Sequence, residues 1–163
     1  MSDENVTLDA AGVPPGSELA EVVAGRADIM ALTQATMEAV LAPQDPGGIS
    51  ATERTAFACR IARLNDEPVL AEHFARLEPE AGAALVQLAD PSFVGDGDVR
   101  VGALIRHVDL VTLSPKDATE EDIAALKRAA ISEADIVRLT EIIAFVNYQV
   151  RVIAGLRLLG KIA

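Results

Sequence analysis

The chain has 163 residues, of which 50% are hydrophobic and 24% are charged. This length and apolar content predict one domain with a real core and exclude a disordered chain. Aromatic residues make up only 3%, so the core consists mainly of Ala, Leu, Ile and Val, which favours helices over a β-sandwich or barrel. The net charge of −11 argues against a basic face for nucleic acid and against docking on an anionic membrane.

The chain has one cysteine, Cys59, and two histidines, His73 and His107. A single cysteine excludes an intramolecular disulfide, a CxxC redox pair and a cysteine-rich zinc site, so we expect no metal and no cofactor. The N-terminus MSDENVTLD is acidic, unlike a signal or transit peptide. The longest charge-free apolar stretch near the end, residues 142–150, is too short to span a bilayer. These features predict a cytoplasmic protein.

In chain order, the sequence predicts a flexible leader over residues 1–16 and a single helical domain over residues 17–163. The leader ends in the breaker sequence VPPG. Apolar spacing, caps and breakers predict eight helices in the domain. They cover residues 17–24, 26–41, 50–65, 68–77, 79–89, 99–113, a segment that begins after Thr119, and 133–159.

Three of these helices begin with a recognisable cap. Ser50 is followed three residues later by Glu53, which is the spacing of a capping box. Thr119 with Asp122, and Ser132 with Asp135, repeat the same spacing. Nothing in the chain indicates a strand.

The last predicted helix has a middle section that is apolar all round. Ile142, Ile143, Phe145 and Val146 cover every side of it, which indicates burial on all sides or a subunit interface. We therefore expect a homo-oligomer. Polar residues follow directly, and Asn147 and Tyr148 are the candidate substrate-binding residues. They line a cavity or bond across an interface, and the sequence leaves both alternatives open.

Two residues are candidates for acid–base chemistry. Glu53 falls on the same helix face as Phe57 and Ile61, where an apolar environment raises a carboxyl pKa and makes a proton carrier. The alternative is a purely structural capping role. His73 lies on the apolar side of its helix as a candidate general base, the alternative being a hydrogen-bonded boundary histidine. His107 is expected at the surface or in an interface.

Cys59 lies among small residues, Ala56, Ala58 and Ala62. Cysteine often packs as a small hydrophobic residue, whereas nearby arginines can lower its pKa and make it reactive. Because no partner thiol exists, the sequence favours the structural role.

The segment ISATERTAFACRIARLNDEPVLAEHFARL, residues 49–77, resembles the signature region of the carboxymuconolactone decarboxylase superfamily, which includes alkylhydroperoxidase D-like proteins. In that pattern a helix opens with Ser-Pro-x-Glu-Arg, and Leu-Asn, a Cys-x-x-Cys pair and a His follow. Residues 104–159 resemble the peroxidase-related branch, through LSP at 113–115, TEEDI at 119–123, SEADI at 132–136, and FVN at 145–147 followed by Arg151.

The resemblance carries over residue by residue. Glu53 matches the helix-opening Glu, Asn65 the Asn before the cysteine pair, and His73 the His after it. The cysteine positions fall on Asp66 and Val69, and the spacing from Asn65 to His73 is one residue short. The redox pair is therefore absent, and thiol peroxidase activity is not expected.

The resemblance implies an all-α, single-domain alkylhydroperoxidase D-like fold of about seven or eight helices, assembled as a dimer, trimer or hexamer. It implies two functions of different classes. One is an enzyme, or a degenerate peroxidase-related enzyme, that acts by acid–base chemistry on a small organic molecule, with His73 as acid or base and Glu53 as its partner. The other is a non-catalytic subunit that binds a small ligand or a cysteine-containing paralogue. Whether the chain is an enzyme is left open.

Overall fold

The computed structural model describes residues 5–77 and 79–161, and within these residues the chain is helical and contains no strand. The prediction of an all-α fold is confirmed. The described residues form nine α-helices and two short 3₁₀ helices: α1 (Val6–Ala11), α2 (Glu18–Ala24), α3 (Ala27–Leu41), α4 (Ala51–Leu64), α5 (Pro68–Leu77), η1 (Pro79–Ala81), α6 (Gly82–Ala89), α7 (Val99–Leu113), η2 (Pro115–Asp117), α8 (Glu120–Arg128) and α9 (Glu133–Leu159).

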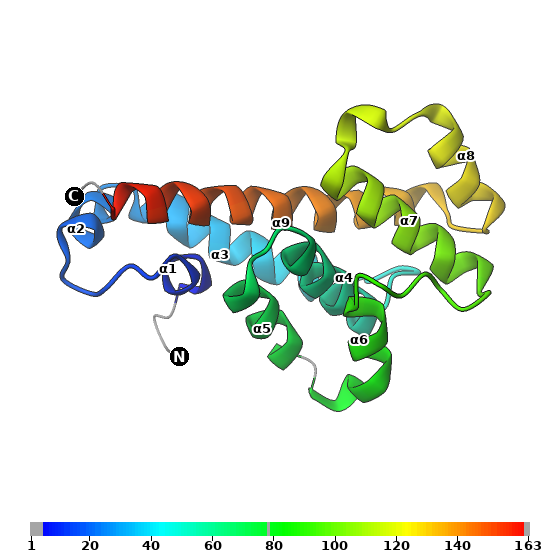
Figure 1. Ribbon diagram of the computed structural model, residues 1–163, viewed down its shortest axis with the longest axis horizontal. Helices are drawn as coiled ribbons and strands as arrows, with labels where there is room; N and C mark the ends of the chain where they lie inside the picture. Colours follow the sequence, from blue (N-terminus) through cyan, green and yellow to red (C-terminus); the bar gives the residue numbers. More distant parts are fainter. Residues whose placement is uncertain (1–4, 78, 162–163) are drawn as a thin grey trace.

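The 27-residue helix α9 is the longest element, and the others are arranged along it. Figure 1 shows α9 running the length of the molecule with α3 beside it, α5 and α6 below it in this view, and α7 and α8 at one end. Helix α4 lies at the centre, where it packs against α5, α6, α7, α9 and α3. All nine residues from 54 to 62 in α4 are buried.

The predicted caps explain where the helices begin. The Ser50 hydroxyl accepts a hydrogen bond from the Glu53 amide at 3.2 Å, and the Glu53 carboxylate accepts one from the Ser50 amide at 2.8 Å, which confirms the capping box. The Ser132 hydroxyl accepts from the Asp135 amide at 3.1 Å. These bonds satisfy amides that a helix leaves unpaired in its first turn.

The structure differs from the predicted flexible leader. Residues 6–11 form α1, which the Asn5 side chain caps by accepting hydrogen bonds from the Thr7 and Leu8 amides. Val6 and Ala10 are buried, and α1 packs against α9, α5 and α3. Tertiary packing stabilises this helix, because six residues are too few to form a helix alone. Residues 1–4 of the predicted leader lie outside the described residues.

The predicted helix over residues 79–89 is divided in two. Its first turn is the 3₁₀ helix η1, and α6 begins at Gly82. Gly82 has a φ of +52°, which glycine adopts at little cost but which breaks a continuous α-helix.

Two fully buried arginines on α4 organise the surrounding loops. The Arg54 guanidinium donates to the carbonyl oxygens of Ile49, Val40 and Pro46 at 2.8–3.0 Å, which ties the loop between α3 and α4 to the core. The side chain is 2% exposed, so these bonds replace its lost hydration.

Arg60, which has no exposed surface, makes five hydrogen bonds, as many as a guanidinium has N–H groups. Two go to the Asp109 carboxylate on α7, both at 2.6 Å. The other three go to the carbonyl oxygens of Leu88, Asp90 and Pro91, at the end of α6. Arg60 thus joins α4, α6 and α7 through one side chain.

The apolar middle of α9 is buried within a single chain. Ile142, Ile143, Phe145 and Val146 are each 6% exposed or less. These four residues therefore do not require a second copy to cover them, and an oligomer needs support from other residues.

Among the described residues, one helix, α9, is long and apolar enough to cross a membrane, as judged by its length and composition alone. Of the most apolar stretch of 18 residues in this helix, 44% is buried inside the protein. Because core helices of soluble proteins meet the same criteria, this is weak evidence for a membrane span.

Replacing Arg60 by Met should lower the free energy of unfolding by about 3–5 kcal/mol, because three carbonyl oxygens and the Asp109 carboxylate lose a buried partner. Urea unfolding followed by circular dichroism measures this change. The matched control is Arg128→Met, which removes an exposed ion pair with Glu121 and should cost less than about 1 kcal/mol. Equal losses in the two variants would contradict the central role of Arg60.

Candidate functional site

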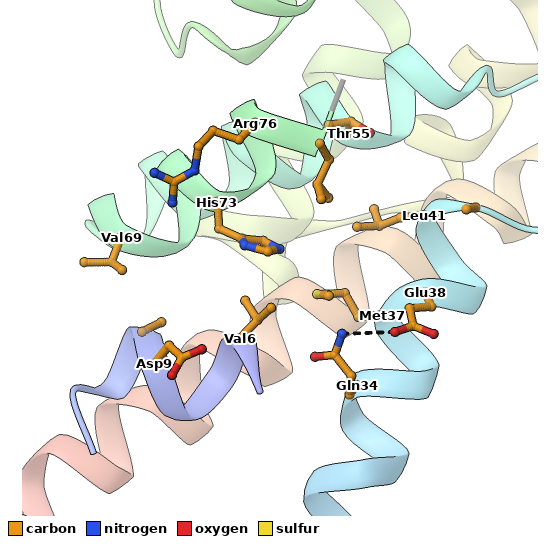
Figure 2. Close-up of a pocket in the computed structure, with 13 residues that line it drawn as sticks. Val6, Asp9, Gln34, Met37, Glu38, Leu41, Thr55, Val69, His73 and Arg76 are labelled. Carbon is orange, nitrogen blue, oxygen red and sulfur yellow. Dashed lines mark hydrogen bonds between the residues drawn. The ribbon is translucent and has the colours of Figure 1, made fainter. Parts of the chain in front are cut away.

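A cavity of about 730 Å³ opens between α1, α3, α4 and α5. We call it the His73 cavity, and Figure 2 shows the imidazole of His73 projecting into it from α5. Its lining is Val6, Asp9, Ala10, Gln34, Met37, Glu38, Leu41, Ala42, Thr55, Val69, His73, Arg76 and Leu77. Its volume is in the usual range for small-molecule sites.

The position of His73 follows from how α5 packs. Pro68 begins the helix, as expected from its fixed φ, and Leu70 and Phe74 turn inward with no exposed surface. The next face of α5 carries Val69 and His73, which reach the cavity. The imidazole is half-buried and meets the Phe74 ring edge-on, with ring centroids 5.8 Å apart.

Carboxylates line the His73 cavity, but Glu53 is not among them. Asp9 from α1 and Glu38 from α3 form part of its wall. In Figure 2 the Gln34 amide donates to the Glu38 carboxylate, at 3.1 Å. Val6, Met37 and Leu41 supply apolar surface between these polar groups.

Glu53 lies at the start of α4 and pairs with Arg100 of α7. The Glu53 carboxylate accepts from the Arg100 guanidinium at 2.5 Å and from the amide and hydroxyl of Ser50 at 2.8 and 3.0 Å. Burial alone would raise the pKa of Glu53, but Arg100 and Ser50 together bring it below 4.5. The expectation of a raised pKa is therefore wrong, because the capping box and Arg100 stabilise the anion. The structure does not bring Glu53 into the cavity with His73.

Asn147 points into the core. Its side-chain amide donates to the Ile143 carbonyl oxygen at 2.9 Å, and its side-chain oxygen accepts from Asn65 at 3.2 Å. Arg151 donates to the Asn147 carbonyl oxygen at 2.7 Å. The side chain is 8% exposed and lines neither the His73 cavity nor the groove described next. Its role here is to join α9 to the end of α4.

Tyr148 lies on the other side of α9, facing α3. Its hydroxyl is 3.1 Å from the Thr33 hydroxyl, and its ring meets that of Phe145 with centroids 6.3 Å apart. Together with Leu32 and Ala144 it lines an apolar groove of about 600 Å³, which we call the α3–α9 groove. Asn147 and Tyr148 therefore belong to different environments, although they are adjacent in sequence.

The remaining titratable candidates are buried. His107 is 6% exposed rather than at the surface, and burial lowers its pKa below 6.5 despite the charge of Asp122. Cys59 has no exposed surface, and its thiol donates to the Ala71 carbonyl oxygen at 3.3 Å. Burial raises the pKa of Cys59 above 9.0, and Arg63 offsets this only in part. The structural interpretation of Cys59 fits this environment.

Sequence reasoning missed most of the cavity wall. Asp9, Gln34, Glu38 and Thr55 come from three helices, and none of them belongs to a motif. No group of three or more potential metal ligands occurs among the described residues.

No protein-family model, curated protein or solved structure matches the chain. The resemblance around Glu53, Asn65 and His73 therefore stays a prediction, and the site is interpreted from its own geometry.

Replacing Glu53 by Gln should lower the free energy of unfolding at pH 7 by about 1–3 kcal/mol, because Arg100 loses its charged partner. The folded-state pKa lies below 4.5, so the carboxylate contributes its full stability above that pH. The contribution is lost as the pH falls through the folded-state pKa.

Urea unfolding of the wild type and of Glu53→Gln, measured from pH 7 down into acid, should therefore give free energies of unfolding that converge at low pH. The exposed Glu121→Gln serves as control and should cost less than about 1 kcal/mol at any pH. A difference that is independent of pH would contradict the assignment.

Cys59 should react with a thiol reagent such as Ellman's reagent at least about 100-fold more slowly in the folded protein than in guanidinium, because reaction requires local opening. Absorbance at neutral pH measures both rates. Similar rates in the two states would show an accessible, reactive thiol.

Proposed function

We propose that the His73 cavity binds a small organic molecule and that His73 transfers a proton to or from it. The observation that carries this proposal is the placement of an imidazole in the wall of a 730 Å³ cavity that also contains carboxylates. Imidazole is the side chain that gains and loses a proton most readily near neutral pH.

The lining fits a molecule with both a carbon skeleton and polar groups. Val6, Met37 and Leu41 provide apolar surface that would cover the skeleton. Gln34 and Thr55 offer an amide and a hydroxyl, which fix the orientation of polar substituents. Arg76, which pairs with Glu72 at 2.9 Å, brings positive charge to the same wall and favours a carboxylate on the ligand.

Two acidic residues support proton transfer by His73. Asp9 and Glu38 share the cavity wall with the imidazole. Carboxylates in the same wall would give a ligand-bound proton a second acceptor beside the imidazole. These residues replace Glu53 as the acidic partners in our proposal.

Residues 49–77 resemble the signature region of the carboxymuconolactone decarboxylase superfamily, and this chemistry agrees with that superfamily's decarboxylase branch, which works by proton transfer without redox cysteines. Asp66 and Val69 occupy the positions of the redox cysteines, and Cys59 is buried. Proton transfer needs no thiol, whereas peroxide reduction by this family's route does. We therefore propose acid–base catalysis rather than thiol peroxidase activity.

Exchange of carbon-bound hydrogen for deuterium tests the proposal without a known substrate. The protein is incubated in D₂O with a panel of small lactones and oxo-carboxylic acids, and proton NMR follows the signal next to the carbonyl group. At least one compound should exchange faster with wild-type protein, and His73→Gln should lower that rate at least about 100-fold. His107→Gln, which alters a buried histidine outside the cavity, should leave it unchanged.

Ligand binding is measured in parallel by saturation-transfer NMR on the same panel. Val69→Trp fills the cavity from a residue that is 47% exposed, so it should abolish binding without unfolding the protein. Binding without any exchange would favour the non-catalytic subunit instead. Exchange that survives in His73→Gln would overturn the catalytic role of His73.

A further inference from the structure

Helix α9 presents a continuous stripe of exposed residues on the side away from the core. We call it the α9 stripe, and its members are Val137, Glu141, Ala144, Tyr148, Arg151, Gly155 and Leu159. The spacings of three and four residues place all seven on one face of the helix. Val137 is 58% exposed and Tyr148 42%, so the stripe contains large apolar side chains in contact with solvent.

The neighbouring helix α3 extends this apolar surface. Leu32 is 62% exposed and borders the α3–α9 groove together with Ala144 and Tyr148. The groove lies on the opposite side of α3 from the His73 cavity, and the two have no lining residue in common. Exposed apolar patches of this kind commonly mark interfaces.

We infer that a second copy of this chain packs on the α9 stripe, with its own α9 antiparallel to the first and a two-fold axis near Val146. The sequence of the stripe is complementary to itself in this register. Residues whose numbers add to 292 lie at the same level, so Ala144 of one copy meets Tyr148 of the other. Val137 then meets Gly155. At both pairs a large side chain lies opposite a small one.

The charges in the stripe select the same register. Glu141 and Arg151 lie five residues on either side of position 146, and each pairs with the other across the two-fold axis. Within the described residues neither side chain takes part in an ion pair. The isologous contact would therefore give two ion pairs around an apolar centre, the arrangement typical of specific dimers.

The available area suits a dimer of modest affinity. A helix of 27 residues is about 40 Å long, and with the shorter α3 beside it the face covers about 600 Å² per copy. The total of about 1,200 Å² is at the lower end of specific interfaces. A lipid surface is a poorer occupant, because Glu141 and Arg151 would enter the apolar phase.

Sedimentation equilibrium of the full chain measures the assembly. Wild-type protein at about 100 μM should have twice the 17.1 kDa chain mass. Ala144→Glu places a carboxylate at the centre of the contact and should raise the dissociation constant at least about tenfold. Because Ala144 is exposed in the single chain, the Ala144→Glu variant should keep the helical circular dichroism of the wild-type protein.

A charge exchange tests the register itself. Glu141→Arg and Arg151→Glu should each weaken the dimer, because each places like charges opposite one another, and the double variant should restore wild-type affinity. Glu120→Arg, an exposed reversal on α8, should have no effect. A monomer at about 100 μM, or an assembly that none of the stripe variants changes, overturns the inference. So does binding to phosphatidylserine vesicles that Ala144→Glu abolishes while the protein stays monomeric.

Discussion

The structure depends on two buried guanidinium groups on α4, in which every nitrogen donates a hydrogen bond. A guanidinium cannot lose its charge, so its burial is tolerated only where fixed acceptors surround it. For Arg60 these acceptors are one carboxylate and three carbonyl oxygens at the end of α6, and for Arg54 they are three carbonyl oxygens of the chain before α4. The two arginines therefore fix irregular segments that have little apolar surface of their own.

The His73 cavity depends on a second set of polar contacts, made by α9. Arg157 donates to the Glu67 carboxylate in the turn between α4 and α5, and to the Ala10 carbonyl oxygen at the end of α1. Gln149 donates to the Thr7 hydroxyl. These bonds hold α1 against α9 and opposite α5, which leaves the space that His73 faces.

The sequence predicted the regular helices well because their signals are local. Ser50, Ser132 and the breakers around Pro68 specify helix ends within a few residues, and α9 begins and ends where the pattern places it. The sequence could not predict α1, because this helix is stabilised by packing against α9, α5 and α3, which are distant in the chain. For the same reason it missed Asp9 and Glu38 as part of the wall of the cavity that contains His73. Glu53 shows a further limit, because the pairing with Arg100 that sets its pKa joins residues 47 positions apart.

The inferred contact with a second copy bears on the composition of α9, whose two sides differ. Its inward face carries Ile142, Ile143 and Val146 against the core, and the polar Asn147 and Gln149 bond to side chains of other elements. A helix covered only on that side normally carries Lys and Glu on the other. The α9 stripe instead has Ala, Gly, Val, Leu and Tyr, with two charges, Glu141 and Arg151, symmetric about its middle. This pattern is difficult to explain for a surface exposed only to water, whereas a contact with a second α9 accounts for both the small residues and the charge symmetry.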